Sequence, residues 1–459
     1  MKKRKWLVVG TTTALWAMLC LSMEAQTAFT LDSCYRLARD RNREIAIAKH
    51  EIEAAKYKEK EVSVNFFPQV SLYGAAVSFG DDLQPINYDK LLGPLSPFVP
   101  PFIKNKTKIG MSDLRFGAVS AVQPLFMGGK IVAGRRMANE ATKLKQSTLE
   151  MKERDVYDAV DEAYWQVVGL SSKLRLGKAY LKLIKDASAD VHILVEQGIA
   201  TKADALSVRV KQSEAEVMLT RIENGLQLSR MLLAQRCGLD PENPIYTTDE
   251  QNGALADGLE LYRSAEDTDI ASVVENRAEV RSLKTAEKIF SLERRMVLAD
   301  MLPHIALVGG YSVSSPNYWS NPDRVFGGTY HIGLALTMPL TGLVSGTFKY
   351  GNANERLLIR KLETDDARTK INLQINQTRL NLTQAHKQLK KAQDNADNSK
   401  ENLRMATIGY KEGVIPVINL TQAQTAWIQA EDALIEAQIG VRVAYTKYQR
   451  AIGVMPMEN

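Results

Sequence analysis

Two parts of the chain repeat one another in the same order, and this constrains the fold more than any other feature of the sequence. The segment Phe67–Gly74 recurs as Leu302–Gly309, at an offset of 235 residues. Further along, Glu196–Ile199 recurs as Lys411–Val414, at an offset of 215 residues. A change of offset between matching segments places a length difference in one loop, which a duplicated fold tolerates. We predict a first structural repeat over residues 26–240, a connecting segment over 241–270 and a second repeat over 271–459.

Each repeat contains a helix longer than an ordinary domain. No proline occurs between Gly129 and Gly198, and apolar or small residues recur there in heptad spacing. A helix over 129–197 would be roughly 100 Å long at 1.5 Å per residue. Gly198 and Gly413 predict chain reversals, because glycine commonly ends a helix. Returning helices are expected over 202–236 and 417–451, so each repeat forms a long helical hairpin.

Each repeat also contains two segments that alternate in hydrophobicity and therefore predict strands. The four predicted strands cover residues 69–79, 115–124, 305–313 and 329–339. At about 10 residues each, they have the length of a tilted strand that crosses a bilayer. Four strands cannot close a membrane-spanning barrel, and lipid does not tolerate an open sheet edge. The chain must therefore oligomerise if the strands span: two copies give 8 strands and three give 12. Proline-rich and glycine-rich segments at 80–113 and 314–328 predict long connecting loops.

The N-terminus indicates export. Four basic residues precede the apolar segment Trp6–Leu21, and cleavage is expected near Ala25, which makes residues 1–25 a signal peptide. A retained membrane anchor is the alternative. Removing four basic residues and one acidic residue lowers the net charge from +6 to +3, so the composition does not favour nucleic-acid binding.

The combined pattern resembles the TolC-like outer-membrane efflux protein family. The segment Thr30–Ala38 is similar to the family's first helix, and Pro124–Gly129 is similar to its glycine-rich exit from strand to long helix. The strand entries after Pro68 and Pro303 match as well. The resemblance implies an α+β membrane protein that forms a homotrimer, with a 12-stranded β-barrel continuous with a helical periplasmic tunnel. It also implies contact with outer-membrane lipid, docking to a periplasmic adaptor protein and an inner-membrane transporter, and location in the outer membrane of a Gram-negative bacterium.

The resemblance also places the tunnel entrance at the tips of the helical hairpins. Well-studied members narrow this entrance with rings of Asp carboxylates, and the matching positions here are Asn419 and Gln422. The equivalent positions of the first repeat are Asp204 and Ser207. Asp204 is either a gating carboxylate or an exposed acid in a first helical turn, where the helix dipole stabilises its negative charge. The turn positions expected to shape the tips and contact the adaptor are Gly198, Thr201, Gly413 and Pro416.

No motif in the sequence indicates enzymatic chemistry. The five histidines are scattered, and we expect no catalytic site, metal site or cofactor. Cys34 and Cys237 are far apart in sequence, and either a disulfide or two buried thiols is compatible with their positions. The predicted function is a passive exit duct for small molecules such as drugs. The alternatives are type I protein secretion or metal-ion efflux through the same kind of channel, and a periplasmic coiled-coil scaffold without a pore.

Overall fold

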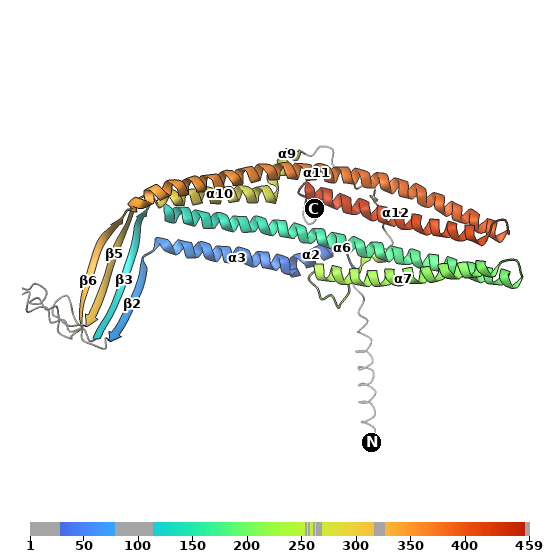
Figure 1. Cartoon of the computed structure of the whole chain (residues 1–459), viewed down its shortest axis with the longest axis horizontal. Coiled ribbons are helices and arrows are strands. Elements are labelled where there is room, and N and C mark those ends of the chain that lie inside the picture. The colour runs from blue at the N-terminus through green and yellow to red at the C-terminus, as the bar shows by residue number, and fades with distance from the viewer. Residues whose placement is uncertain are drawn as a thin grey trace, which may run out of the picture. The chain divides into compact units, whose positions relative to one another are not determined.

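Two helical hairpins dominate the fold (Figure 1). The computed structural model describes residues 28–78, 113–252, 255, 258, 259, 262, 269–315 and 326–454. The expected signal peptide, nearly all of the 80–113 loop and the middle of the 314–328 loop lie outside the described residues. In the first hairpin α6 (Lys130–Glu196, 67 residues) turns into α7 (Lys202–Arg236, 35 residues). In the second, α11 (Leu340–Lys411, 72 residues) turns into α12 (Val417–Ala451, 35 residues).

Shorter elements accompany the hairpins. The helices that enter the sheet are α3 (Arg43–Ser63), which follows α2 (Leu31–Arg41), and α10 (Ala278–Ala299), which follows α9 (Ile270–Asn276). The remaining short elements are η1 (Val64–Phe66), α8 (Thr248–Asn252), and the parallel pair β1 (Ala28–Phe29) and β4 (Tyr246–Thr247). Within the described ranges, none of the helices is both long and apolar enough to cross a membrane.

The predicted heptad seams pack as expected. None of the seam residues is exposed. On α6 they are Val156, Val160, Ala163, Val167, Leu170, Leu174, Gly177, Leu181, Ile184, Ser188, Val191 and Val195, and on α11 they are Ile371, Ile375, Thr378, Leu382, Ala385, Leu389, Ala392, Ala396, Ser399, Leu403, Ala406 and Tyr410. Val160 and Val167 are fully buried in the largest apolar cluster, which α2, α6 and α7 build together. The heptad spacing is therefore explained by ordinary coiled-coil packing between the helices.

Both hairpins end in the same turn. Gly198 has φ +73° and Gly413 has φ +72°, a left-handed conformation that glycine adopts without strain. The Ile199 N–H donates to the Leu194 carbonyl at 2.9 Å, and the Val414 N–H donates to the Gly409 carbonyl at 2.8 Å. These are Schellman caps, which satisfy the last carbonyls of a helix.

The C-terminal ends of α7 and α12 have the same kind of cap. Gly238 and Gly453 also have positive φ, and the residue after each donates five positions back along the helix. All four glycines keep the 215-residue offset, so the duplication extends to the local capping geometry.

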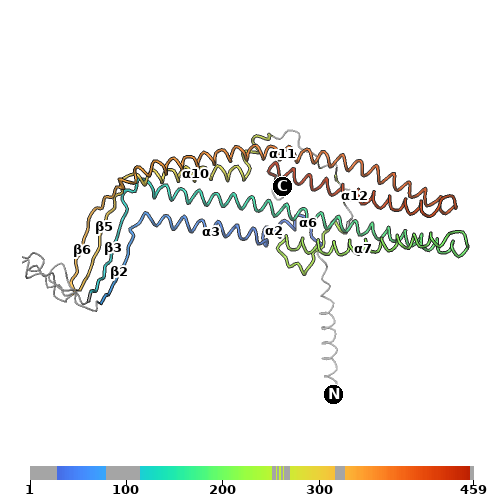
Figure 2. The backbone as a smooth tube through the Cα atoms, viewed as in Figure 1, coloured from blue at the N-terminus to red at the C-terminus, as the bar shows by residue number. Residues whose placement is uncertain are grey.

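The four long strands form one antiparallel sheet in the order β2-β3-β5-β6. They are β2 (Gln69–Ser78), β3 (Asp113–Met127), β5 (His304–Ser315) and β6 (Gly327–Thr337). The pairs β2–β3 and β5–β6 are the two hairpins of the repeats, and β3 pairs with β5 to join them. Figure 2 shows that α3, α6, α10 and α11 meet the sheet in the same order as the strands they adjoin. Ion pairing of Lys130 with Asp300 at 2.7 Å connects the start of α6 to the end of α10.

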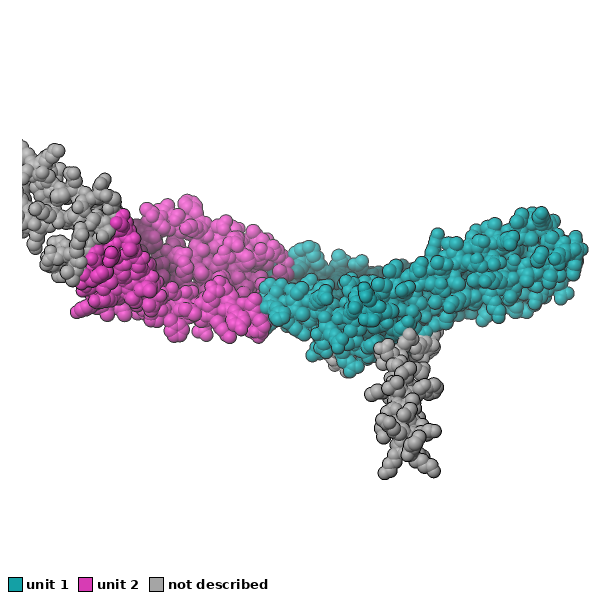
Figure 3. Space-filling model, turned by 90° about the horizontal axis from the view of Figure 1, so that it is seen from below, with its two compact units in different colours: residues 1–51, 145–282, 364–459 teal, residues 52–144, 283–363 magenta. Residues whose placement is uncertain are grey.

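The compact units of the chain do not coincide with its repeats (Figure 3). Unit 1 comprises residues 1–51, 145–282 and 364–459, and unit 2 comprises residues 52–144 and 283–363. Unit 2 holds all four strands of the sheet, and unit 1 holds both hairpin turns. Each unit therefore takes one part from each repeat, because long helices from both copies pack side by side.

A buried polar cluster fixes the end of α12 in unit 1. The Arg450 side chain is 3% exposed and forms an ion pair with Asp158 of α6. It also donates to the Tyr35 hydroxyl at 3.2 Å, and Tyr35 donates to Asp161 at 3.0 Å. Buried charges are stable only when paired in this way.

The same unit buries the two cysteines. Cys34 of α2 and Cys237 at the end of α7 are both free thiols in the largest apolar cluster. A hydrogen bond to Cys34, together with burial, raises the pKa of the Cys237 thiol. The sequence left this state open, and the structure has two buried thiols rather than a disulfide.

The buried carboxylate predicts a specific pH dependence. Burial raises the pKa of Asp161 from 3.8 to about 6, although Arg450 and Tyr35 oppose this effect. The folded protein therefore binds this proton more tightly than the unfolded chain does, and stability falls as the pH rises from about 4 to about 6. This contribution amounts to about 3 kcal/mol. In Asp161→Asn that part of the pH profile should disappear when the midpoint of thermal unfolding is measured against pH.

Asp186→Asn is the matched control, because Asp186 is an exposed carboxylate on the same helix. This control should retain the wild-type profile. An unchanged profile in Asp161→Asn would show that another group carries the dependence.

Candidate functional site

The sheet of unit 2 has one apolar face. Directly paired residues of neighbouring strands lie on the same face. One row across the sheet is Leu72, Val119, Tyr311 and Tyr330. The adjoining rows on this face add apolar residues, which are Val70, Ala121, Ile332, Leu307, Leu334, Ile305 and Leu336. We call this set the apolar face.

The apolar face is open to the surroundings of a single chain. Leu72 is 80% exposed and Ile332 is 75% exposed. Soluble monomers rarely expose contiguous apolar patches of this kind. The face requires an apolar environment, and lipid is one that accepts a whole sheet face.

The middle rows of the opposite face carry mainly small and polar residues, while Val122 and Val308 lie beyond them toward one end and Phe116 toward the other. One row consists of Ser71, Ser120, Gly310 and His331, and the next of Tyr73, Ala118, Ser312 and Thr329. An alternation of apolar and polar faces is typical of strands that separate lipid from an aqueous interior.

The sheet ends in two edges. β2 and β6 stand at the two ends of the strand order, so each has one neighbour among the described strands. Their outer N–H and C=O groups form a template for further strands. The arrangement can therefore extend into a larger sheet by adding copies of the same chain.

The first hairpin tip contains a capping box. The Asp204 backbone N–H donates to Thr201 Oγ1 at 3.2 Å, and the Thr201 N–H donates to Asp204 Oδ2 at 2.9 Å. Hydrogen bonds from Thr201 lower the pKa of the Asp204 carboxyl. The structural role expected for an acid in the first helical turn is therefore present.

The second hairpin tip lacks this box. Pro416 is the N-cap of α12 and makes no side-chain capping bond. Asn419 occupies the position that corresponds to Asp204, and only its backbone N–H bonds to the Pro416 carbonyl, at 3.1 Å. The two tips share a backbone turn and differ in their chemistry.

Five of the predicted tip residues lie around one groove or form its turns. The groove between the two tips has a volume of about 840 Å³, and its lining includes Asp204, Gly413 and Pro416. Gly198 and Thr201 form the turn that carries Ile199 and Ala200 into the same lining. We call this space the tip groove.

The other three predicted residues lie outside the groove. Ser207, Asn419 and Gln422 are exposed on α7 and α12, and none of them lines it. In a single chain they face solvent.

Sequence reasoning missed the apolar character of the tip groove. Ile199 is 72% exposed and Val414 is 76% exposed, and both follow the turn glycines directly. An apolar residue follows the turn glycine in both repeats, and this shared pattern could have indicated an apolar tip. Tyr410 also lines the groove, and its hydroxyl is buried with no hydrogen-bond partner among the described residues. Burial raises the pKa of Tyr410, and the nearby charges of Asp190 and Asp204 add to this effect.

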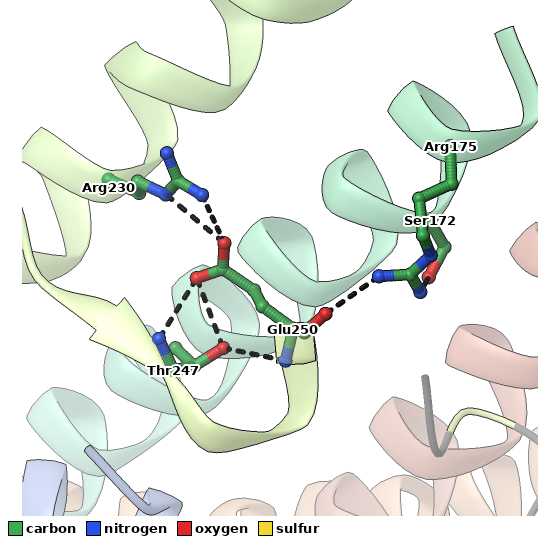
Figure 4. Close-up of polar contacts among 5 residues, drawn as sticks. All are labelled: Ser172, Arg175, Arg230, Thr247 and Glu250. Atoms are coloured by element: carbon green, nitrogen blue, oxygen red, sulfur yellow. Dashed lines mark hydrogen bonds and ion pairs between the residues drawn. The ribbon is translucent and has the colours of Figure 1, made fainter. Parts of the chain in front are cut away.

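The connecting segment is anchored to the first hairpin by one carboxylate (Figure 4). Glu250 of α8 forms an ion pair with Arg230 of α7 and accepts from the Thr247 N–H at 2.9 Å. The Glu250 carbonyl accepts from Arg175 of α6 at 2.6 Å, and Arg175 also donates to Ser172 at 2.9 Å. Glu250 thus connects β4 and α8 to both helices of the hairpin, to α7 through its carboxylate and to α6 through its main-chain carbonyl.

Comparison with known proteins places the chain among transport proteins. The family model for outer membrane efflux proteins matches residues 34–238 and 270–454. No curated protein sequence matches the chain. Across the described part of the structure, no group of three or more His, Cys, Asp or Glu residues could hold a metal ion.

Solved outer-membrane proteins share the fold at low sequence identity. VceC of Vibrio cholerae is 13% identical with a TM-score of 0.72, and the match covers 92% of this chain and 96% of VceC. The CmeC channel of Campylobacter jejuni is 13% identical with a TM-score of 0.74, covering 94% of this chain and 90% of CmeC. The MtrE channel of Neisseria gonorrhoeae is 16% identical with a TM-score of 0.71, covering 92% of this chain and 89% of MtrE.

The capping box predicts a local effect of Asp204→Ala. The substitution leaves the Thr201 cap in place but removes the hydrogen bonds that Thr201 donates to the Asp204 carboxylate, which should destabilise the first turn of α7 by about 1 kcal/mol, the usual net contribution of a hydrogen bond. Amide hydrogen exchange at residues 202–205 should then accelerate roughly fivefold. Asp190→Ala is the control, because Asp190 lines the same groove from α6 without capping α7. Equal acceleration in both variants would contradict the capping role.

Proposed function

The chain belongs to the outer membrane efflux protein family, and we propose that it is the passive exit duct for small molecules in a tripartite efflux system. The protein is therefore an outer-membrane efflux channel of a Gram-negative bacterium, with its helical part in the periplasm. In the proposed system, an inner-membrane pump and a periplasmic adaptor deliver the substrate. The duct itself is passive and needs only a continuous polar passage, so the energy for transport comes from the pump. The family consists of transport channels rather than enzymes.

One observation carries the proposal: the sheet has an apolar face, an opposite face whose middle rows are mainly small and polar, and two open edges. A sheet of this kind fits a wall between lipid and an aqueous passage. A periplasmic scaffold without a pore has no need for an exposed apolar face.

The open edges support a homotrimer. In lipid every backbone polar group needs a partner, so β6 of one copy would pair with β2 of the next until the ring closes. Three copies give a 12-stranded barrel. The long helices also expose apolar side chains for which a neighbouring copy is a natural cover: Leu206, Val210, Val217 and Leu228 on α7, and Val344, Phe348, Leu362 and Leu373 on α11.

The hairpin tips are the proposed entrance. Ile199 and Val414 offer exposed apolar contacts beside the turn positions Gly198, Thr201, Gly413 and Pro416. These features suit an adaptor that presents its own apolar tips. Asp204, Ser207, Asn419 and Gln422 are the proposed lining of the entrance, with Asp204 as its carboxylate.

Charge on the apolar face should block assembly. Ile332→Arg places a cation in the middle of β6 toward the proposed lipid side, which costs about 2–4 kcal/mol per chain at the bilayer midplane. We expect a marked loss of trimer from the outer-membrane fraction, measured by crosslinking and by mass determination in detergent. His331→Arg is the matched control, since it changes the adjacent residue on the opposite face.

Two results would refute the proposed assembly. One is recovery of the wild-type protein as a stable monomer or dimer in detergent, or its recovery entirely in the soluble fraction. The other is an equal loss of trimer in Ile332→Arg and His331→Arg.

Single-channel conductance separates the two roles of Asp204. Asp204→Asn keeps a hydrogen-bond acceptor for the Thr201 N–H but removes the charge, whereas Asp204→Ala removes both. If the carboxylate lines the entrance, both variants should lose cation preference to the same extent. A change in Asp204→Ala alone would leave Asp204 with a capping role and remove it from the entrance.

A further inference from the structure

Unit 2 contains a groove of its own, which lies where the helices meet the sheet. It has a volume of about 710 Å³ and is lined by α3, η1, α6 and α10. Its charged lining consists of Arg135, Arg136, Lys288, Arg295, Glu59 and Glu140. We call it the strand-end pocket.

Three cations of the pocket lie near the helix ends that adjoin the strands. α6 begins three residues after β3 ends, so Arg135 and Arg136 lie in its second turn. Arg295 lies in the last turn or so of α10, which ends at Ala299, five residues before β5 begins. At 1.5 Å per residue, these three cations lie roughly 6–9 Å along their helices from the ends that face the sheet.

The cations of the pocket lack acidic partners. Arg136, Lys288 and Arg295 form no ion pair within the described residues, and Arg135 contacts the Phe66 ring at 6.0 Å from its centroid. One carboxylate of the pocket is neutralised, because Glu140 pairs with Lys143 at 2.6 Å. Among the described residues, the Glu59 carboxylate accepts only from the Asn139 amide, at 3.4 Å.

Three other arginines of unit 2 have side-chain partners. Arg356 binds Glu293 at 2.5 Å, Arg360 binds Glu363 at 2.5 Å, and Arg294 donates to Asn354 at 2.7 Å. Within the pocket, four cations face a single unpaired carboxylate, Glu59, and this creates a local excess of positive charge that attracts anions.

The pocket also has apolar walls. Phe66, Val132 and Leu292 line it, and Phe66 and Val132 are exposed. Phe67, next in the chain, is exposed too and leads into β2. A ligand that fits this lining combines an anionic group with hydrocarbon.

We propose that the strand-end pocket binds the phosphate headgroup of an anionic phospholipid from the periplasmic leaflet of the outer membrane. This inference rests on the proposed function, which places the sheet in the bilayer. Arg136 and Arg295 hold the phosphate oxygens, since the guanidinium fork matches phosphate geometry. Lys288 adds a third charge. The acyl chains leave the pocket past Phe66 toward the strands.

Native mass spectrometry tests the site. The protein is reconstituted into phosphatidylcholine vesicles doped with phosphatidylglycerol and extracted in a mild detergent, and the lipids retained per chain are counted. Wild type should retain phosphatidylglycerol in preference to phosphatidylcholine. Arg136→Gln/Arg295→Gln should retain roughly tenfold less phosphatidylglycerol, because each basic residue near an anionic lipid surface strengthens binding.

The matched control is Lys349→Gln/Lys361→Gln. It removes two exposed positive charges from α11 of the same unit, outside the pocket, and should retain the wild-type amount of phosphatidylglycerol. Equal losses in the two double variants would overturn the site, as would equal retention of both lipids by wild type. Saturable binding of inorganic phosphate to the lipid-free protein, without phosphatidylglycerol retention, would reassign the pocket to free phosphate and overturn the lipid site.

Insertion separates this inference from the proposed function. A protein that inserts into the vesicles but shows no lipid preference overturns only the lipid site. A protein that does not insert overturns the proposed function and the lipid site with it.

Discussion

The backbone N–H and C=O groups along β2 and β6 have strand partners on one side only within a single chain. In lipid an unpaired backbone group costs several kcal/mol, so a sheet with open edges cannot remain in the bilayer. Closure by further copies is the solution that four strands leave. The apolar face adds the same demand in a second form, because Leu72 and Ile332 have no cover in a single chain. The proposed assembly would thus follow from the strand count and the face pattern of the sheet.

The helical part meets a different requirement, which is to hold very long helices in a defined register. Apolar seams alone permit sliding by a heptad, since each repeat of the seam resembles the next. Paired buried charges are more specific. Arg450 with Asp158 and Tyr35 joins the end of α12 to α6 and α2, which are far away in the sequence. Glu250 joins α8 to α7 through Arg230 and to α6 through Arg175. We infer that these contacts select one register, which is the best-attested use of buried polar groups.

Duplication preserved the backbone at the tips while the side chains diverged. The Schellman turns at Gly198 and Gly413 are alike, but only the first tip carries the capping box of Thr201 and Asp204. Tip chemistry can change in this way because the turn is satisfied by backbone bonds alone. The side chains at the tips can therefore change without loss of the hairpin.

The sequence by itself determined the elements whose signals are local. The returning helices were expected over 202–236 and 417–451, and α7 and α12 occupy those residues, because turn glycines and caps act within a few positions of the helix ends. The family was also identified correctly from the sequence, although each motif that carried the resemblance is degenerate. What only the tertiary structure decided depends on contacts between distant residues. Examples are the pairing of β3 with β5, the capping bonds of Asp204, the buried hydroxyl of Tyr410 in the tip groove, and the meeting of Arg136 and Arg295 at the strand-end pocket. No periodicity in a single sequence encodes such meetings, because they arise only when helices from both repeats pack side by side.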